Sequence, residues 1–574
     1  MSEGFAAIRD KAQATWTSKQ DSKVPRIVIG MGACGISIGA NRVKAAFESE
    51  LKQRGIAASV EKTGCNGMCH REVLVDIVRP GKPGITYGNV TPAVVPSLIE
   101  DCVAKDGTRP DLAVATLGEE TVDGIPPYRE LPFFKWQQRI VTRHWGLIDP
   151  DSIEDYIANG GYGAFAKALF EMKPEEVIEE VKKSDLMGRG GAAFPAGVKW
   201  ESCRKAKGYP KYVICNGEEG EPGIFKDRRL MEANPHSVIE GMLIAAVAIG
   251  SDQGYFYIGG EHLLAIERVQ RALEQAKEYG LLGNRILGTD FSFKITVRRG
   301  AGSYAAGESS ALMSSIEGRR AMPRVKLVRS VERGLWMKPT SMNNVESYAN
   351  IPDIVRNGGA WYAGIGTEKG KGTKLFALSG NIANTGLVEV PIGTSLRRLV
   401  YDIGGGIPGG KRFKAAQPGG PSGGCLPASL LDIPMDFDPL EEVGSTMGSG
   451  GLVIMDEDVC MIDMAKYFLD FDQRESCGRC TSCRIGTQRL YDILEAISIG
   501  EGVPKDLEML EVLGEVTREA SLCGLGQAAA LFALSTVRHF PEEYRAHIEE
   551  KRCPANVCRE ISGRPTRESE MALR

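Results

Sequence analysis

A stretch of small residues is the feature that most constrains this chain. Residues 188–200 read Gly-Arg-Gly-Gly-Ala-Ala-Phe-Pro-Ala-Gly-Val-Lys-Trp, with four glycines and three alanines. Helix and strand interiors disfavour this composition because glycine loses the most freedom on ordering. Such a backbone can lie directly against a flat or phosphorylated ligand, with its N–H groups aimed at phosphate oxygens and with Arg189 and Lys199 adding positive charge. A flexible loop is the alternative in a chain with 69 glycines, so the later motifs must decide.

Length, charge and hydropathy limit the class of protein. At 574 residues the chain should form several domains, and 43% hydrophobic with 25% charged residues is typical of globular proteins in water. A net charge of -4 gives no reason to expect nucleic acid or an anionic membrane as a partner. No uninterrupted apolar run reaches the ~18 residues of a membrane-spanning helix, and the polar residues 1–23 lack a signal-peptide core. We expect a cytoplasmic protein that is not an integral membrane protein.

The fourteen cysteines are clustered, and thiols in a reducing compartment favour metal or iron–sulfur ligation over disulfides. Cys477, Cys480 and Cys483 have a spacing that converges on a cubane cluster when the chain curls around it. The helical pattern of residues 490–516 can return a fourth ligand, Cys523. This set indicates a [4Fe–4S] cluster. Zinc is the alternative, and the agreement of the spacing with the motifs below disfavours it.

Residues 26–104 read as a small α/β unit. Strands are expected at residues 26–29, 73–78 and 84–87, and helices at residues 40–54 and 91–103. Cys34 follows the first strand, and Cys65 and Cys69 lie in a glycine-containing loop. Residues 106–150, rich in proline, glycine and acids and then in aromatic residues, should form a linker that docks against the next domain.

From residue 151, strands, glycine-containing loops and helices alternate. An apolar strand from residue 211 runs into an acidic loop, and a strand at 292–297 runs into a second loop that is rich in glycine and alanine. Between them come a helix at 236–249, a strand at 255–258 and a helix at 263–279. The alternation predicts a parallel α/β sheet that binds ligands at the carboxyl ends of its strands. No dinucleotide fingerprint stands in its usual strand–helix setting, so this is not an ordinary Rossmann domain.

These segments, with residues 334–340 and 342–346, resemble the NADH-oxidising FMN subunit of respiratory complex I. They are also similar to its relatives in soluble NAD-linked hydrogenases, formate dehydrogenases and electron-bifurcating hydrogenases, over about residues 155–550. The resemblance implies a multidomain α/β fold. Its expected parts are an N-terminal extension (1–24), a thioredoxin-like [2Fe–2S]-type domain (25–105), the linker (106–150), a Rossmann-like FMN and NAD(P)H domain (151–370), a ubiquitin-like β-grasp domain of the soluble-ligand-binding type (371–455), a C-terminal helical bundle with the [4Fe–4S] cluster (456–545) and a tail (546–574).

The resemblance also implies which residues bind FMN and the nucleotide. It puts Glu221 beside the nicotinamide and Tyr304 in the cavity lining. Since hydride transfer needs no side-chain acid or base, both should position rather than react. The other implied cofactor-binding residues are Gly188, Arg189, Gly190, Gly191, Phe194, Lys199, Asn216, Glu218, Glu219, Gly307, Glu308, Ser309, Lys326, Arg329, Asn343 and Asn344. Loop glycines and solvated acids are the alternative, which several separated motifs in family order disfavour.

Two departures from the family concern the nucleotide. Ser309 stands where the family has a second Glu that contacts the adenosine ribose, and Arg329, just after Lys326, stands where it has an adenine-stacking Phe. A carboxylate near the 2′-hydroxyl repels a 2′-phosphate, whereas an arginine attracts one. We therefore hypothesise use of NADPH or of both nucleotides. The alternative is that Arg329 stacks on adenine and Ser309 is a tolerated change.

The N-terminal cysteines depart from the family as well. The thioredoxin-like domain of complex I binds [2Fe–2S] with a C-x4-C pair and a C-x3-C pair. Here Cys65 and Cys69 form the second pair, but Ile29 stands where Cys34 should have its partner. A lost cluster, a cluster with a non-cysteine ligand and a labile cluster are the three interpretations, and we prefer the lost cluster. His70 is the nearest substitute ligand, but a surface histidine is the preferred interpretation.

The tail contains Cys553 and Cys558 in a C-P-A-x-x-C pattern. With His547 and either Cys460 or Cys425 they would form a His/Cys set suited to tetrahedral zinc. Relatives in the bifurcating-hydrogenase branch carry a similar pattern followed by a ferredoxin domain, which is not expected here. A pair of free thiols is the alternative to zinc.

The expected function is that of a diaphorase subunit of a multisubunit redox complex. Hydride would pass between NAD(P)(H) and FMN, and single electrons between FMN and the [4Fe–4S] cluster. Expected partners are a small [2Fe–2S] thioredoxin-like subunit and a catalytic subunit such as a hydrogenase or formate dehydrogenase, with ferredoxin as a further candidate; electron bifurcation stays open. The alternative function is an electron-relay or assembly subunit with weakened nucleotide binding.

Overall fold

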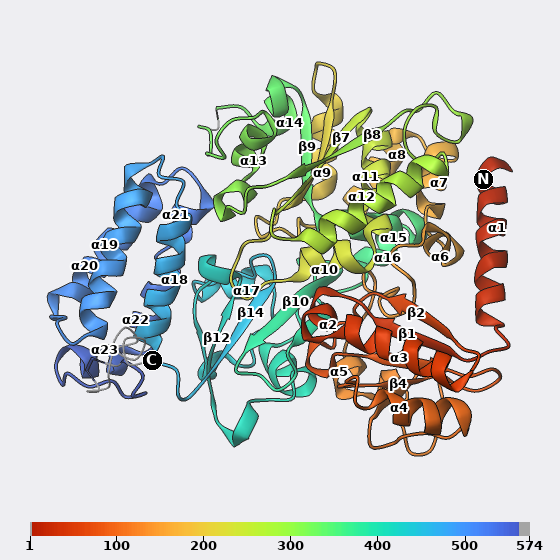
Figure 1. Cartoon of the computed structure of the whole chain (residues 1–574). Helices are drawn as coiled ribbons and strands as arrows, with labels where there is room; N and C mark the ends of the chain where they lie inside the picture. The colour runs from red at the N-terminus through yellow and green to blue at the C-terminus, as the bar shows by residue number, and fades with distance from the viewer. Residues whose placement is uncertain (1–2, 326, 559, 562–574) are drawn as a thin grey trace.

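The computed structural model describes residues 3–325, 327–558 and 560–561. Three sheets occupy different parts of the molecule, with helices between and around them (Figure 1). The N-terminal region, in red and orange, and the C-terminal region, in blue, lie on opposite sides of the central sheets. A multidomain α/β architecture with mixed and parallel sheets is confirmed. Within the described part of the chain, no helix combines the length and apolarity needed to cross a bilayer.

The N-terminal sheet has the strand order β2-β1-β3-β4-β5. Its strands are β1 (Arg26–Gly30), β2 (Ser59–Thr63), β3 (Val75–Val78), β4 (Ile85–Tyr87) and β5 (Ala113–Thr116). β1 and β2 are parallel, and the other pairs are antiparallel. Helix α3 (Ala40–Arg54) buries Val43, Phe47 and Leu51 against this sheet, and it ends at Gly55, whose left-handed φ of 65° favours glycine.

The structure differs from the sequence expectations in this region. β5 lies in the segment expected to be a linker, and it extends the sheet by pairing with β4. The single helix expected at 91–103 is instead α4 (Val95–Leu98) followed by a wider π-helical turn, η2 (Ile99–Ala104). The polar N-terminal extension forms helix α1 (Glu3–Gln20), which buries Phe5 and packs against α6 (Ile153–Ala158).

The central sheet has the order β8-β7-β6-β9, and all of its neighbours are parallel, as predicted. Its strands are β6 (Tyr212–Gly217), β7 (Gln253–Ile258), β8 (Lys294–Arg299) and β9 (Thr340–Asn344). The helices around it are α7 (Gly163–Phe170), α8 (Pro174–Lys183), α9 (Ala196–Lys205), α10 (Lys226–Ala233), α11 (Pro235–Ile249), α12 (Leu263–Glu278), α13 (Ser309–Ile316), α14 (Ser330–Arg333), α15 (Val345–Asn357) and α16 (Gly359–Ala363). α11 and α15 approach so closely that a Cβ on Gly241 would lie 2.1 Å from the carbonyl oxygen of Tyr348.

The third sheet has the order β11-β10-β14-β12-β13. Its strands are β10 (Thr373–Gly380), β11 (Gly386–Pro391), β12 (Phe413–Pro418), β13 (Leu426–Pro427) and β14 (Gly451–Asp456). The segment before the central region docks on this sheet, because the N–H groups of residues 140–142 all donate to the buried carboxylate of Glu389 at 3.0–3.1 Å. One buried anion thereby fixes the course of the linker.

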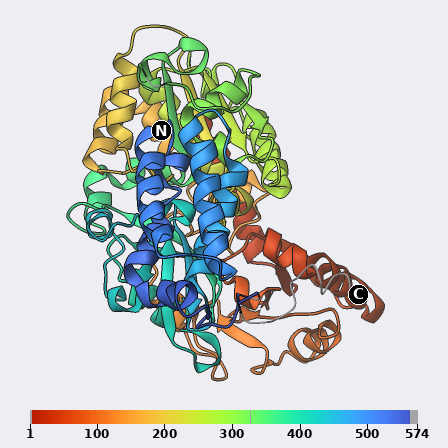
Figure 2. The same cartoon turned by 90° about the vertical axis from the view of Figure 1, so that its left-hand side faces the viewer.

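The C-terminal region is helical, and its blue helices stand in front of the sheets in Figure 2. They are α18 (Met461–Glu475), α19 (Thr481–Ser498), α20 (Lys505–Ala520), α21 (Gly524–Ala528), α22 (Leu531–His539) and α23 (Pro541–Ile548). α19 packs against both α18 and α20, and the shared core includes Leu490, Leu494, Leu510 and Phe532. This packing returns Cys523, at the start of α21, toward the cysteines that precede α19.

Candidate functional site

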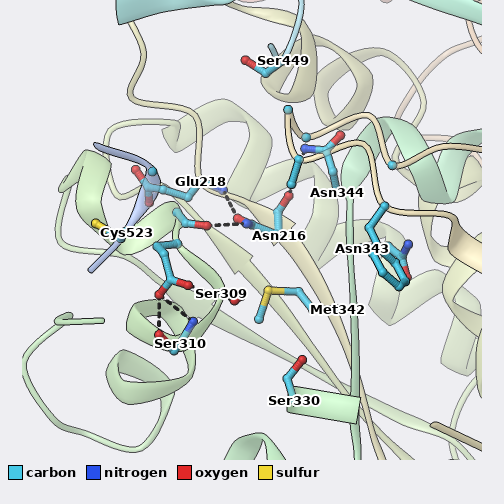
Figure 3. Close-up of a pocket in the computed structure, with 18 of the residues that line it drawn as sticks. Asn216, Glu218, Ser309, Ser310, Ser330, Met342, Asn343, Asn344, Ser449 and Cys523 are labelled. Carbon is cyan, nitrogen blue, oxygen red and sulfur yellow. Dashed lines mark hydrogen bonds between the residues drawn. The ribbon is translucent and has the colours of Figure 1, made fainter. Parts of the chain in front are cut away.

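A cavity of about 1270 Å³ opens at the carboxyl ends of the parallel strands. Its walls come from the glycine stretch, the loops after β6 and β8, the end of β9, a loop before β14 and the C-terminal region at Cys523 (Figure 3). Pockets for one small molecule usually have about 300–1000 Å³, so this cavity can hold two adjacent ligands. Its place matches the ligand position of parallel α/β sheets.

Most of the residues implied to bind cofactors line this one cavity. They are Gly188, Gly190, Gly191, Phe194, Lys199, Asn216, Glu218, Glu219, Glu221, Tyr304, Gly307, Glu308, Ser309, Arg329, Asn343 and Asn344. Lys326 lies outside the described residues. The expectation that the charge of Arg189 faces the ligand is wrong, because its side chain is 1% exposed and donates to the carbonyl oxygens of Lys371 at 2.7 Å and Thr373 at 3.0 Å. Arg189 anchors the glycine stretch to the start of β10.

The glycine stretch forms a wall of bare backbone. A Cβ on Gly190 would lie 3.0 Å from the Cβ of Asn344. Gly191 has a φ of 104°, a backbone angle that residues with a side chain rarely adopt. At the far end of the stretch, the ammonium group of Lys199 donates to the carbonyl oxygen of Met342 at 2.8 Å, and burial lowers its pKa to about 8. The absence of a side chain at Gly190 thus makes room for Asn344. Both glycines also line the cavity, where their backbone can contact a ligand.

Two asparagines at the ends of the strands line the cavity. The Nδ2 of Asn216 donates to the carbonyl oxygen of Gly307 at 2.9 Å, and its Oδ1 accepts from the N–H of Glu218 at 3.1 Å (Figure 3). The Oδ1 of Asn343 accepts from the indole N–H of Trp200 at 3.1 Å. The Nδ2 of Asn343 is buried and has no hydrogen-bond partner among the described residues. Such a donor costs about 1–3 kcal/mol unless a ligand accepts from it.

A network of buried charged side chains lies beside the cavity, and no motif in the sequence predicted it. The Lys226 ammonium lies 2.6 Å from a carboxylate oxygen of Asp227 and 3.2 Å from one of Glu346. Lys374 reaches the same Glu346 oxygen at 3.2 Å, and the Nδ2 of Asn344 donates to Asp227 at 2.6 Å. Buried charges persist when paired in this way. Because the partners come from α10, α15 and β10, no local motif could reveal the network.

The acidic loop contains two carboxyl groups in different states. Burial, with repulsion from Glu261 and Glu475, raises the pKa of Glu218 to about 8, and neither of its carboxyl oxygens has a hydrogen-bond partner among the described residues. Glu219 instead accepts from the N–H groups of residues 226–228 at the start of α10, at 2.8–3.0 Å. Burial still raises its pKa to about 7. With this pKa, Glu218 is mostly a neutral acid at neutral pH.

Glu221 is held between two regions of the chain. The hydroxyl of Tyr304 donates to one of its carboxylate oxygens at 3.2 Å, and the hydroxyl of Ser449 donates to the other. Burial raises its pKa, which these two hydrogen bonds lower. A Cβ on Gly420 would lie 2.2 Å from its carboxyl carbon, so this glycine makes room for the acid. Sequence reasoning missed Ser449, which follows the third sheet's glycine-rich segment and carries no motif.

One end of the cavity is basic. The Glu308 carboxylate accepts two N–H groups of the first turn of α13 at 2.8 and 2.9 Å, and the hydroxyl of Ser309 donates to it at 3.1 Å. Arg329 pairs with Glu332 at 2.8 Å through a side chain that is 67% exposed. The arginines that line this end are Arg324, Arg329 and Arg333. Arg324 and Arg333 were not predicted, although the basic composition of residues 319–333 was a usable signal.

Four cysteines of the C-terminal region, the pocket cysteine set, come together at the cavity. They are Cys477, Cys480, Cys483 and Cys523. Burial and the other three thiols raise the pKa of Cys483 to about 12. Backbone N–H groups of residues 483 and 522 point at the sulfur of Cys480, and those of residues 525 and 526 at the sulfur of Cys523. Four thiols with N–H···S hydrogen bonds fit an iron–sulfur cluster, and Cys523 and Tyr304 both line the cavity.

Three cysteines of the N-terminal region, the N-terminal set, also converge. The thiol of Cys69 interacts with those of Cys34 and Cys65. This contact and the charge of Arg229 lower the pKa of Cys34 to about 7 and that of Cys65 to about 6, against the effect of burial. The guanidinium of Arg229, on α10, donates to the sulfur of Cys34. The set therefore faces the central region of the protein.

His70 is not part of the N-terminal set in this arrangement. Its Nδ1 lies 3.2 Å from the carbonyl oxygen of Thr385, and its ring packs 5.2 Å from that of Phe133. Burial lowers its pKa. It is neither a substitute ligand nor a free surface histidine, because it fastens the N-terminal region to the third sheet.

A third group, the tail set, has ligand atoms that all lie within 4.8 Å of one another: Cys460, His547, Cys553 and Cys558. The Nε2 of His547 is 3.6 Å from the sulfur of Cys460 and 3.3 Å from that of Cys558. Its Nδ1 lies 2.8 Å from a carbonyl oxygen one helical turn earlier, which leaves Nε2 free to bind a metal. Burial lowers its pKa, but contacts with Cys460 and Cys553 raise it to about 10. Cys460, not Cys425, completes the set.

Three family descriptions match parts of the chain. Residues 181–353 match the Nuo51 FMN-binding domain. Residues 463–547 match the NADH-ubiquinone oxidoreductase-F iron-sulfur binding region. Residues 375–426 match the SLBB domain. The first match contains both asparagines and the acidic loop, and the second contains the whole pocket cysteine set.

Curated proteins and solved structures extend the match. The chain is 52% identical over 424 residues to NADP-reducing hydrogenase subunit HndC of Solidesulfovibrio fructosivorans, covering 74% of this chain and 86% of the relative. It is 46% identical over 415 residues to an NADH-quinone oxidoreductase F subunit of Rhizobium meliloti, covering 72% and 99%. It resembles a solved NAD+-reducing [NiFe]-hydrogenase in the H2-reduced state with a TM-score of 0.64 and 26% identity, covering 98% of this chain and 93% of that one.

The site fits the cofactors that these matches indicate. The backbone at residues 190–191 and the amide of Asn216 on the cavity wall suit FMN, the remaining volume suits NAD(P)(H), and the pocket cysteine set suits one [4Fe–4S] cluster. The chain belongs to the family of NAD(P)H-oxidising flavoprotein subunits that includes the NADH-quinone oxidoreductase F subunits and the hydrogenase subunit HndC.

Proposed function

We propose that this chain is the diaphorase subunit of a multisubunit redox complex, with FMN against the glycine stretch and NAD(P)H in front of it. The flavin supplies hydride acceptance and single-electron release. The observation that carries this proposal is that Gly190, Gly191 and Cys523 line one cavity. Electrons can thus leave the flavin compartment for the pocket cysteine set without crossing another domain.

The protein's own residues bind and orient in this proposal. The backbone at residues 190–191 supports the flavin, and Asn343 lies beside it on the cavity wall. Asn216 and Asn344 are already braced by their own hydrogen bonds, so they hold their amides in place before the ligand arrives. Preorganised donors of this kind lower the cost of binding.

The nicotinamide end is defined by two acids. Glu221, fixed by Tyr304 and Ser449, offers carboxylate oxygens to an amide or hydroxyl group of the nucleotide. Glu218, mostly neutral at pH 7, donates without adding a negative charge near the nucleotide phosphates. Neither acid has to transfer a proton, so both act by position.

An anaerobic titration tests the proposal. Adding NADH or NADPH to the purified holoprotein should bleach the flavin absorbance and then reduce the [4Fe–4S] cluster, followed by visible spectra and electron paramagnetic resonance (EPR). A flavin that stays oxidised with both nucleotides would favour the electron-relay alternative. Ser449→Ala should weaken flavin reduction by about two- to tenfold, the value of one hydrogen bond.

For the nucleotide itself, we infer NADP(H) use. Ser309 and three arginines border one end of the cavity, and guanidinium groups recognise phosphates well. A relative that is 52% identical is named an NADP-reducing hydrogenase subunit. Arg324→Ala should lower kcat/KM for NADPH by about tenfold or more and leave the value for NADH nearly unchanged. Arg319→Ala, on an exposed neighbour, is the control; equal losses for both nucleotides would reject the inference.

The finer parts of the architecture are also proposals. The N-terminal sheet is thioredoxin-like, the third sheet is a β-grasp domain, and the C-terminal helices form a bundle around the pocket cysteine set.

The tail set binds structural zinc, since a His/Cys3 set with atoms within 4.8 Å suits a tetrahedral ion. The partners are a small [2Fe–2S] subunit and a catalytic subunit. This agrees with the hydrogenase names of one relative and one similar solved structure. Mass spectrometry of copurified proteins tests the partners.

A further inference from the structure

The N-terminal set has three cysteines, and the residue at the fourth position cannot replace the missing one. Ile29 is fully buried in the core of the N-terminal sheet. Its side chain is also apolar, so it offers no ligand atom. A fourth ligand for Cys34, Cys65 and Cys69 must therefore come from another part of the chain.

Glu72 reaches the set. Its side chain is 5% exposed, and one carboxylate oxygen accepts from the N–H of Leu74 at 3.2 Å. The other oxygen is buried with no hydrogen-bond partner among the described residues, and the carboxyl group contacts the thiol of Cys65. If Gly35 carried a Cβ, that atom would lie 3.0 Å from a carboxylate oxygen of Glu72, and a Cβ on Gly30 would lie 3.4 Å from the same oxygen. These glycines, on either side of Cys34, leave the space that the carboxyl group occupies.

From this geometry, we propose that Cys34, Cys65, Cys69 and Glu72 hold a [2Fe–2S] cluster. A buried carboxylate oxygen without a donor is unfavourable, and a bound cation removes that cost. A carboxylate carries the same charge as the missing thiolate, so the total ligand charge equals that of four cysteines. Iron accepts oxygen ligands beside softer ones. The cluster of this domain is thus retained with an exchanged ligand, in place of the loss that the sequence suggested.

The surroundings favour a two-iron cluster over a single ion. In the tail set all ligand atoms lie within 4.8 Å of one another, as one ion requires, whereas the N-terminal set with Glu72 is not gathered so closely. The N–H of Gly67 donates to the sulfur of Cys65 at 3.3 Å, and the guanidinium of Arg229 donates to that of Cys34. Hydrogen bonds to the sulfurs are a feature of iron–sulfur sites.

The site is also fixed against the central region. Arg229 pairs with Glu232 at 2.7 Å, and Glu232 accepts from the N–H of Ala33 at 3.0 Å, one residue before Cys34. Both belong to α10, which carries Asp227 on the cavity wall. The inference does not depend on the diaphorase proposal, since it concerns ligation only.

The test uses the full chain, purified without oxygen and with its other cluster in place. The dithionite-reduced protein should show a second EPR signal, of [2Fe–2S] type, beside that of the pocket cysteine set. Cys65→Ala and Glu72→Ala should each abolish this signal and remove iron and acid-labile sulfide in equal amounts. Asp76→Asn, at another buried carboxyl of the same sheet, should leave both unchanged.

Glu72→Cys separates ligation from folding. It should keep the iron and shift the EPR signal and the visible charge-transfer bands toward those of an all-cysteine cluster. Iron that is unaffected by Cys65→Ala would overturn the proposal, as would an EPR signal unaltered by Glu72→Cys. Zinc bound in a Cys65-dependent manner would overturn it too. If Glu72→Ala does not fold, the wild-type signal and Glu72→Cys still decide.

Discussion

The two ends of the chain attach their cysteines to the central region in different ways. The pocket cysteine set opens onto the cavity, because Cys523 and Tyr304 lie on its wall. The N-terminal set does not line the cavity; it contacts α10, whose Arg229 donates to the sulfur of Cys34. Backbone N–H groups point at sulfurs of the first set. In the second set the N–H of Gly67 and, in addition, the charged side chain of Arg229 donate to sulfurs.

Because of this difference, we expect electron transfer to depend on the first set and stability to depend on the second. A set on the cavity wall affects how electrons leave the ligand, and its removal should leave the fold largely intact. The buried pair Arg229–Glu232 lies within α10, and its members also contact Cys34 and the N–H of Ala33. The N-terminal set therefore affects how two regions hold together, because buried charges need their partners. The comparison predicts that losses at the C-terminal set appear first as lost electron transfer and losses at the N-terminal set as lost stability.

The largest expected effect is that of Cys523→Ala. Without this ligand, electron transfer from NAD(P)H to a ferredoxin-type acceptor should fall by about a hundredfold or more, because the route through the cluster is lost. Flavin bleaching by the nucleotide should persist. Cys65→Ala should keep at least about half of the transfer rate. Stopped-flow absorbance measures both steps, and Cys203→Ala, at a buried cysteine outside the three sets, is the control. Equal losses in Cys523→Ala and Cys65→Ala would break the comparison.

Next in size is Arg229→Met, which leaves the buried carboxylate of Glu232 without its partner. Removing one member of a buried pair costs about 3–5 kcal/mol, so the N-terminal region should unfold or be cleaved at much lower urea concentration. The double variant Arg229→Met with Glu232→Gln should recover part of the loss. Pulse proteolysis measures the change. Arg228→Met, one residue away and packed on Phe225, should cost less than about 1 kcal/mol, and a matching loss there would contradict the argument.

How much of the site could be predicted follows from how local its parts are. The cysteines at 477–483 and the loops after β6 and β8 lie within short segments, so their spacing predicted that the four cysteines come together and that the sheet is parallel. β2 was missed because it is only partly buried and shows no clear alternation. β5 was missed because it stands in a segment whose composition is typical of a linker.

The parts that could not be predicted depend on contacts between distant segments. The role of Arg189 changed because carbonyl oxygens of residues 371 and 373 surround its guanidinium, which no glycine-rich motif reveals. Ser449 reaches Glu221 from another sheet, and Glu72 reaches Cys65 from the far side of its loop. Composition and spacing describe which groups a chain has; packing decides which of them face a ligand.

Removing the tail set should have a moderate effect confined to the C-terminal region. His547→Ala should abolish stoichiometric zinc, measured by plasma mass spectrometry, and lower the midpoint of thermal unfolding of the C-terminal region by about 4–8 °C, the shift for about 1 kcal/mol in a region of about 100 residues. The [4Fe–4S] signal should remain. His539→Ala, in the neighbouring α22, should change neither quantity. Zinc that survives in His547→Ala would show that the tail set is not a metal site.

A change in the pH dependence of stability is expected at Glu218. Because its pKa is raised to about 8, the folded protein binds more protons than the unfolded chain between about pH 4.5 and about pH 8. Stability therefore falls as pH rises through this window. Glu218→Gln stays neutral, so its stability should fall less steeply, by up to about 1.4 kcal/mol per pH unit for one proton. Urea unfolding between about pH 5 and about pH 9 measures the difference between the two proteins, which includes the loss of the repulsion between Glu218 and Glu219. Parallel curves would mean that Glu218 is ionised in the folded cavity, and the assignment of a neutral donor at the nicotinamide end would then fail.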